Sequence, residues 1–274
     1  MYNPVVMANI RLIASDLDGT LLQNGAQKLN EETCGLIQNL KDCGIRFMAS
    51  SGRQFDNLCR LFEPVKEDIY YLCQNGASAY ADGSVLFQRL IDEELSRRLI
   101  TDIVSRPELE VLVSGFACSF VEEKSEALYR HMSDVVRTKT IRTGDILSTV
   151  SGCTKISFFE ENGLHDTAYW YRTYGERLSI AVGGPQWLDM TDRGVNKGTA
   201  FVHMLEYLQI DPAETMVFGD NLNDLEILDA AGVAVSVAGG AQPVKQRADL
   251  VTDTVEQVIR EILAGRRKTE DWKK

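Results

Sequence analysis

Residues 10–21, with the sequence IRLIASDLDGTL, give the clearest indication of the fold and of the site. The first five of these residues are apolar apart from one arginine, which is typical of a short buried strand. Two acids, Asp16 and Asp18, follow the strand, with glycine and threonine directly after them. In open α/β sheets the ligand crevice lies beyond the carboxyl ends of the strands. Two like charges this close repel each other, and a bound cation would relieve the repulsion, so the stretch predicts a cation site. The alternative is a solvated turn, because Asp-Gly is a common turn pair.

The composition is that of a globular protein. The chain has 274 residues, of which 44% are hydrophobic and 25% charged. At roughly 150 residues per domain, this is enough for two domains with a substantial core. The 29 basic and 40 acidic residues give a net charge of −11. A chain this acidic repels a phosphate backbone, and its one basic run (266–268) lies near the C-terminus, so we expect no nucleic-acid binding.

Cysteine spacing and hydropathy indicate the compartment. The six cysteines form no C-x-x-C pair and have no histidine at ligand spacing, so we expect buried thiols and no zinc site. The sequence shows no evident secretory signal, and its longest mostly apolar stretch, 111–121, is about half as long as a bilayer helix. These patterns predict a soluble, cytoplasmic protein without a membrane partner, and they leave the oligomeric state open.

Apolar strands and helices alternate in the first part of the chain. After the opening strand, residues 45–49 and 69–72 also predict strands, and all three end in Ser, Asp or Asn beside glycine. The alternation returns from residue 196, with strands expected at 215–218 and 232–235. Such alternation favours a parallel sheet with helices on its faces, which makes the fold class α/β.

The middle of the chain has a different pattern. Residues 78–87 predict a hairpin around an Asp-Gly turn. From about residue 90 to 190, strand pairs separated by helices favour an α+β module with an antiparallel sheet and helices on one side. We therefore expect a core formed by residues 1–83 and 191–274, and an inserted domain of residues 84–190.

Polar side chains gather at the expected strand ends and helix starts: Asp16, Asp18, Ser51, Lys197, Asp220, Asn223 and Asp224. In a single parallel sheet these positions lie at the same edge, beyond the carboxyl ends of the strands. Phosphoryl transfer through a covalent intermediate needs a carboxylate nucleophile, a divalent metal, groups that neutralise phosphoryl oxygens, and a proton donor. These residues supply the nucleophile, the neutralising groups and the proton donor, together with acids that could bind the metal.

Asp16 and Asp18 are the predicted catalytic carboxylates. Asp16, held by the strand, is the expected nucleophile and a metal ligand; the alternative is a metal ligand only. We expect Asp18 to protonate the leaving oxygen and then activate water, and its backbone carbonyl to contact the metal. Thr20 either orients Asp18 or is a plain turn hydroxyl.

Four further residues are expected to neutralise or contact the phosphate or the substrate. Ser51 offers a hydroxyl donor, and Gly52 lets the backbone approach. Lys197, at the start of a helix, adds a positive charge where the helix dipole already favours anions. Arg53 either reaches the substrate or forms an ion pair.

The remaining acids predict the metal site. Asp220, after its strand, should complete the site with Asp16 and Asp18, and oxygen ligands of this kind suit Mg²⁺. Asp224 and Asn223 are expected to contact the metal, its waters or Lys197. Asn223 could instead begin a helix as its cap.

Four segments resemble, in order and spacing, the motifs of the haloacid dehalogenase superfamily: DLDGT at 16–20, SGR at 51–53, KG at 197–198 and GDNLND at 219–224. The resemblance is greatest to the Cof-type hydrolases, in which a large α/β cap is inserted between the second and third motifs. It implies a Rossmann-like core, a cap that selects the substrate, and Mg²⁺-dependent phosphatase activity. The implied substrates are sugar phosphates or other small phosphorylated metabolites.

One further likeness and two departures accompany the four motifs. The segment QNGA at 74–77 is similar to one that precedes the cap in this branch, which implies that Asn75 contacts the substrate or its phosphate. Gly240 stands where relatives commonly have asparagine. Ser51 replaces a frequent threonine and keeps the hydroxyl.

Two other functions use the same residues. A phosphomannomutase-like phosphotransferase would pass the phosphoryl group to another hydroxyl instead of water. A catalytically silent phosphometabolite-binding protein would keep the fold without turnover, since fold does not determine function. The intact Asp16, Asp18, Lys197 and Asp220 argue against the silent protein.

Overall fold

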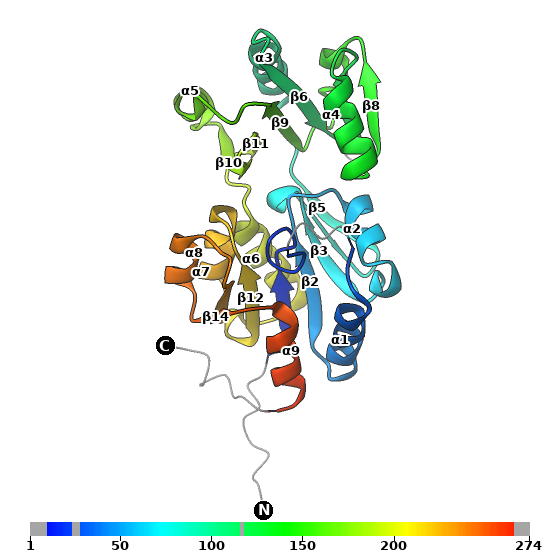
Figure 1. Cartoon of the computed structure of the whole chain (residues 1–274), viewed down its shortest axis with the longest axis vertical. Helices are drawn as coiled ribbons and strands as arrows, with labels where there is room; N and C mark the ends of the chain where they lie inside the picture. The colour runs from blue at the N-terminus through cyan, green and yellow to red at the C-terminus, as the bar shows by residue number, and fades with distance from the viewer. Residues whose placement is uncertain (1–9, 24–27, 116–117, 266–274) are drawn as a thin grey trace, which may run out of the picture.

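A computed structural model describes residues 10–23, 28–115 and 118–265 of the chain (Figure 1). The basic run at 266–268 lies outside the described residues. Two sheets organise the molecule, one of eight strands and one of six. Figure 1 shows them as the centres of two domains, one above the other. Within the described residues, no helix combines the length and the apolar character needed to cross a membrane.

The larger sheet has the strand order β14-β13-β12-β1-β2-β3-β4-β5. Its strands are β1 (Leu12–Ser15), β2 (Arg46–Ser50), β3 (Ile69–Cys73), β4 (Ser78–Ala81), β5 (Ser84–Gln88), β12 (Thr215–Gly219), β13 (Val233–Val237) and β14 (Leu250–Thr252). The central strand β1 pairs in parallel with both β2 and β12, and every residue of β1 is buried. Burial on both faces explains why these strands are continuous apolar runs. The predicted α/β fold class is confirmed.

Helices cover both faces of the larger sheet. One hydrophobic cluster joins Ile13 to α1 (Glu31–Asp42), α2 (Phe55–Leu61) and α9 (Val255–Leu263). A second cluster joins the alternate residues Leu12 and Ala14 to the helices of the opposite face, α6 (Lys197–Leu208), α7 (Leu225–Asp229) and α8 (Gln242–Arg247). Short 3₁₀ turns complete this part: η1 (Glu63–Val65), η2 (Gln74–Gly76), η5 (Pro212–Glu214) and η6 (Leu222–Asp224).

The smaller sheet has the order β10-β11-β9-β6-β7-β8. Its strands are β6 (Leu109–Ser114), β7 (Ser119–Glu122), β8 (Thr140–Thr143), β9 (Lys155–Glu160), β10 (Leu178–Gly184) and β11 (Trp187–Asp192). The expected antiparallel sheet is confirmed for all pairs except β7 and β8, which run in parallel. The helical segments here are α3 (Glu93–Val104), α4 (Glu126–Arg130), η3 (His131–Val135), η4 (Ile146–Thr149) and α5 (Thr167–Tyr174).

The helices of this domain lie on both faces of its sheet, which corrects the expectation of one side only. The helices α3 and α5 pack with Val111 and Phe158 on one face. The segment α4–η3 packs through Leu128 and Met132 against Leu112, on the other face. The reason is that β6 offers apolar side chains to both faces, so each face can bury a helix.

Hydrogen bonding corrects one expected boundary. The predicted hairpin is present as β4 and β5, with Asp82 and Gly83 at positive φ in its turn. The division at residue 84 assigned Ser84–Gln88 to the inserted domain, but this strand pairs with β4 of the larger sheet. The short elements β8, β14 and α8 were not predicted, because runs of three to six residues give little periodicity.

Candidate active site

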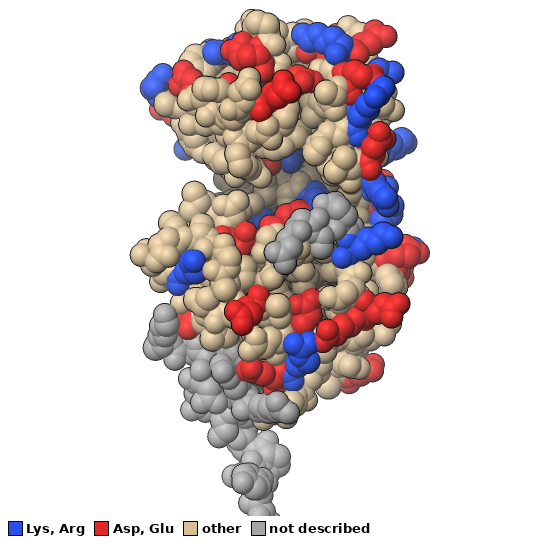
Figure 2. Space-filling view, in the orientation of Figure 1, with Lys and Arg blue, Asp and Glu red and all other residues tan. Residues whose placement is uncertain are grey.

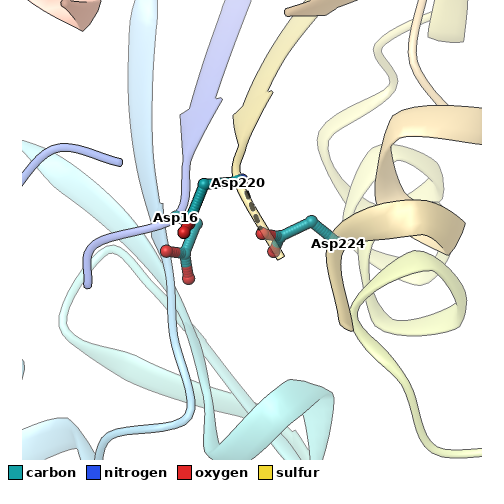
Figure 3. A group of neighbouring side chains, drawn as sticks. All are labelled: Asp16, Asp220 and Asp224. Atoms are coloured by element: carbon teal, nitrogen blue, oxygen red, sulfur yellow. Dashed lines mark hydrogen bonds between the residues drawn. The ribbon is translucent and has the colours of Figure 1, made fainter. Parts of the chain in front are cut away.

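Two acids follow adjacent strands of the larger sheet. The backbone N–H of Asp16 donates to the carbonyl of Phe218 at 2.9 Å, so the β1–β12 ladder continues to this acid. Carboxylate oxygens of Asp16, Asp220 and Asp224 lie within 4.8 Å of one another. Figure 3 shows Asp16 and Asp220 side by side, with Asp224 reaching them from the chain that follows β12. The structure thus brings three of the predicted acids together at one sheet edge.

Lys197 is buried between two of these acids. Its Nζ donates to Asp16 Oδ1 at 2.5 Å and to Asp224 Oδ1 at 2.6 Å, and only 1% of its side chain is exposed. Burial lowers the pKa of Lys197, but the attraction of the two carboxylates outweighs this effect and raises the pKa above its ordinary value. The side chain is therefore an ammonium fixed beside Asp16.

Asp224 holds the site together through both of its carboxylate oxygens. While Oδ1 accepts from Lys197, Oδ2 accepts from the backbone N–H groups of Asp220 at 3.0 Å and Asn221 at 3.1 Å. The predicted contact with Lys197 is present. With both oxygens engaged in this way, Asp224 is suited to position Lys197 and Asp220.

The acidic group fits a divalent cation. Burial raises the pKa of Asp16 and the pKa of Asp220, and the negative charge of Asp224 adds to the rise at both. With all three acids ionised, three carboxylates would face one ammonium, an excess of two negative charges in a mostly buried site. A cation with a preference for oxygen ligands, such as Mg²⁺, matches both the charge and the donor atoms. Asp16 and Asp220 are the residues that would hold it.

The Asp18 side chain lies outside this group. Its carboxylate accepts two hydrogen bonds from Arg53, from Nε at 2.8 Å and from Nη2 at 2.5 Å. Arg53 also donates to Asn57 at 3.1 Å, and its side chain is only 13% exposed. Of the two expectations for Arg53, the structure contains the ion pair. The metal contact expected of Asp18 stays a prediction about its backbone carbonyl.

Thr20 orients a different acid from the one expected. Its hydroxyl donates to Asp220 Oδ1 at 2.7 Å, so the interpretation that it orients Asp18 is wrong. The chain turns at Gly19, where φ is +98° and a Cβ would lie 2.3 Å from Asp220 Oδ2. This turn folds Thr20 back onto β12, which no pattern within residues 16–20 reveals.

The loops after β2 and β3 lie against the same site. Ser51 is buried, and its hydroxyl accepts from the Arg53 N–H at 3.2 Å. A Cβ on Gly52 would lie 3.2 Å from Asn75 Oδ1, so glycine permits this close approach. Asn75 adopts φ 57° and accepts from Asn223 Nδ2 at 3.2 Å. The η6 turn is capped by Asn221 instead of Asn223.

Two residues of the smaller sheet reach this loop region and were missed from the sequence. Lys155 Nζ donates to the Gly52 carbonyl at 3.3 Å and to Asp189 Oδ2 at 3.1 Å. Asp189 Oδ2 also accepts from Asn75 Nδ2 at 3.0 Å. The sequence feature that could have indicated Lys155 is its alternation with Ser157, as two polar residues in an otherwise apolar strand.

A cavity of about 350 Å³ lies between the two domains. Figure 2 shows that the surface is hollowed between the two domains on the face drawn. The lining from the larger domain includes Asp16, Asp18, Ser51, Arg53, Asn75 and Asn223. Gly240 is not among the lining residues, and a Cβ there would meet Ser236 Oγ at 2.7 Å and Asp220 Cα at 3.2 Å. The backbone here therefore suits glycine.

A buried carboxylate lies beside an ammonium and two further acids that suit a cation, under a second domain, and such an arrangement suits phosphoryl transfer. Residues 13–262 match the family model of the haloacid dehalogenase-like hydrolases. The chain belongs to this family, and its resemblance to the Cof-type phosphatases is confirmed. The matched family is one of hydrolases.

Similar proteins include several phosphatases. The chain is 24% identical to the 5-amino-6-(5-phospho-D-ribitylamino)uracil phosphatase of Escherichia coli, over 92% of this chain and 97% of the relative. It is 26% identical to a phosphatase of Bacillus subtilis, over 89% of this chain and 95% of the relative. Among solved structures, a haloacid dehalogenase-like hydrolase from B. subtilis has a TM-score of 0.81 at 21% identity, over 92% of this chain and 98% of that one. This structure supports the fold alone.

Proposed function

We propose that the enzyme is a Mg²⁺-dependent phosphatase that hydrolyses a small phosphorylated metabolite, such as a sugar phosphate, through a phosphorylated Asp16. One observation is central to this proposal. The Asp16 carboxylate, held by Lys197 and next to Asp220, opens into a cavity that the inserted domain covers. The family membership and the phosphatases among the relatives support the reaction type.

In this proposal the residues of the site divide the chemistry between them. Asp16 attacks the phosphorus, and Lys197 with the Ser51 hydroxyl neutralises the phosphoryl oxygens. Asp18 gives a proton to the leaving oxygen and later takes one from the attacking water. For this step Asp18 must leave Arg53, which donates two hydrogen bonds to its carboxylate. Mg²⁺, when bound by Asp16 and Asp220, would neutralise charge that develops on the phosphoryl group.

Mg²⁺ binding should depend on pH. Because burial raises the pKa of Asp16 and of Asp220, protons compete with the metal at low pH. We expect the affinity for Mg²⁺ to fall with decreasing pH, by up to about tenfold per pH unit for each proton displaced. Conversely, the metal-free protein should lose stability as the pH rises through the raised pKa values, and Mg²⁺ should restore it.

Titration calorimetry and thermal unfolding at several pH values check this expectation. Asp220→Asn should weaken Mg²⁺ binding, whereas Asp42→Asn, at an exposed position of α1, should not. An affinity that is the same at all pH values would argue against a metal held by these acids.

Phosphate release from a panel of phosphorylated metabolites tests the proposed function. We expect release from a few of them in the presence of Mg²⁺, and none after chelation with EDTA. Analysis of the products separates hydrolysis from transfer: inorganic phosphate indicates a phosphatase, and an isomeric sugar phosphate indicates a mutase. A folded protein that binds Mg²⁺ but converts no member of the panel would count against both.

A further inference from the structure

The smaller sheet turns one face toward the cavity, and that face changes character along its strands. The register places Ser114 opposite Lys155 and Leu112 opposite Ser157. On the other side of β9, Asp189 is opposite Ser157. All of these residues line the cavity. The alternate residues, such as Ile156 and Phe158, face away and pack with α3 and α5.

The end of this face nearest the larger domain is polar. Lys155 and Asp189 contact the loops that follow β2 and β3, as described above. Ser157 donates to Asp189 Oδ1 at 2.6 Å, and Ser119 accepts from Gln54 at 2.8 Å. Donors and acceptors alternate here, close to Ser51 and hence to the expected position of the phosphate. Such a lining suits hydroxyl or other polar groups next to the ester.

The end away from the larger domain is apolar and aromatic. Trp187 is opposite Phe159, two residues further along β9 than Ser157, and the two rings lie 5.1 Å apart. His131 and Met132 reach the same place from η3, with the imidazole 6.3 Å from the Trp187 ring. Flat aromatic side chains and a methionine sulfur favour contact with a planar ring over contact with a polyol.

We propose that the leaving group of the substrate has two parts, a polar linker next to the phosphate and a planar ring at its far end, which binds against Trp187 and Met132. This inference deepens the proposed function and rests on it. The volume of about 350 Å³ is near the lower end of the roughly 300–1,000 Å³ of ligand pockets, so the ring is small. Trp187 is then a specificity-determining residue, and a bare sugar phosphate fills only the polar part.

Two matched probes test this inference. Uridine 5′-monophosphate has the ribose phosphate of ribose 5-phosphate and adds a ring beyond it. We expect the Asp16→Asn variant, in which turnover should be absent, to bind the nucleotide at least tenfold more tightly than the sugar phosphate. Adding Trp187→Ala should reduce this preference to about twofold and leave the affinity for ribose 5-phosphate unchanged. Titration calorimetry in the presence of Mg²⁺ measures both.

Two further variants separate ring recognition from loss of structure. Trp187→Phe keeps a ring and should retain most of the preference. Tyr207→Ala removes an aromatic side chain that is 58% exposed on α6, away from the cavity, and should change neither affinity. Equal binding of the two probes by the parent, or a preference that survives in Trp187→Ala, would overturn the inference.

Turnover is measured separately, on the enzyme with Asp16 intact. If it hydrolyses ribose 5-phosphate but shows no ring preference, the proposed function stands and the ring site is wrong. If it binds the nucleotide preferentially but hydrolyses neither probe nor any other phosphoester, the ring site stands and the phosphatase is wrong.

Discussion

Asp16→Asn should lower kcat by about four orders of magnitude or more, the scale of loss seen when a nucleophile is removed. The amide has nearly the same shape as the carboxylate, but it cannot attack phosphorus to form an acyl phosphate. Its oxygen can still accept from Lys197, which also keeps its bond to Asp224 at 2.6 Å. Because the substitution removes one of three crowded negative charges, the stability of the metal-free protein should be unchanged or increased.

The measurement is kcat for phosphate release, together with thermal unfolding of the same samples. Asp42→Asn, the exposed control, should leave both unchanged. Appreciable turnover in Asp16→Asn would mean that Asp16 is a metal ligand only and that another group attacks. Thermal unfolding shows whether Asp16→Asn is folded, and so distinguishes loss of the nucleophile from loss of the native structure.

Lys197→Met should remove activity and also destabilise the fold. The methionine has a similar length but no charge, so the buried Asp16 and Asp224 would lose the ammonium that they share. Leaving a buried charge without its partner costs about 3–5 kcal/mol. The loss should be greatest at high pH and should shrink as the pH falls, because the raised pKa of Asp16 lets this acid take up a proton.

Urea unfolding of the metal-free protein at two pH values measures this effect. Lys124→Met is the matched control, because its ion pair with Glu122 has a lysine side chain that is 62% exposed. An exposed pair of this kind contributes about 0–1 kcal/mol, so the control should be nearly neutral. Mg²⁺ should restore part of the lost stability in Lys197→Met but none of the activity. A variant as stable as the parent at every pH would contradict the electrostatic role of Lys197.

The sequence by itself determined the core and the kinds of residue in the site. Strands such as β1 and β12 bury both faces, so their apolar runs are evident without any structure. The strand-end positions of Asp16 and Asp220 follow from the same runs, because parallel strands place their carboxyl ends on one edge. Local signals of this kind also include the helix that begins at Lys197, capped by Asn196.

Only the tertiary structure decided which of these residues are partners. Thr20 donates to Asp220, 200 positions away, although Asp18 is the acid nearer to it in sequence. Asp189 meets Asn75 across 114 positions and across the two domains. Short-range periodicity reports which face of a strand or helix is buried, but not which other segment packs there. Which residues become partners depends on how the two sheets and their loops pack around one cavity, and on which charged side chains this packing buries.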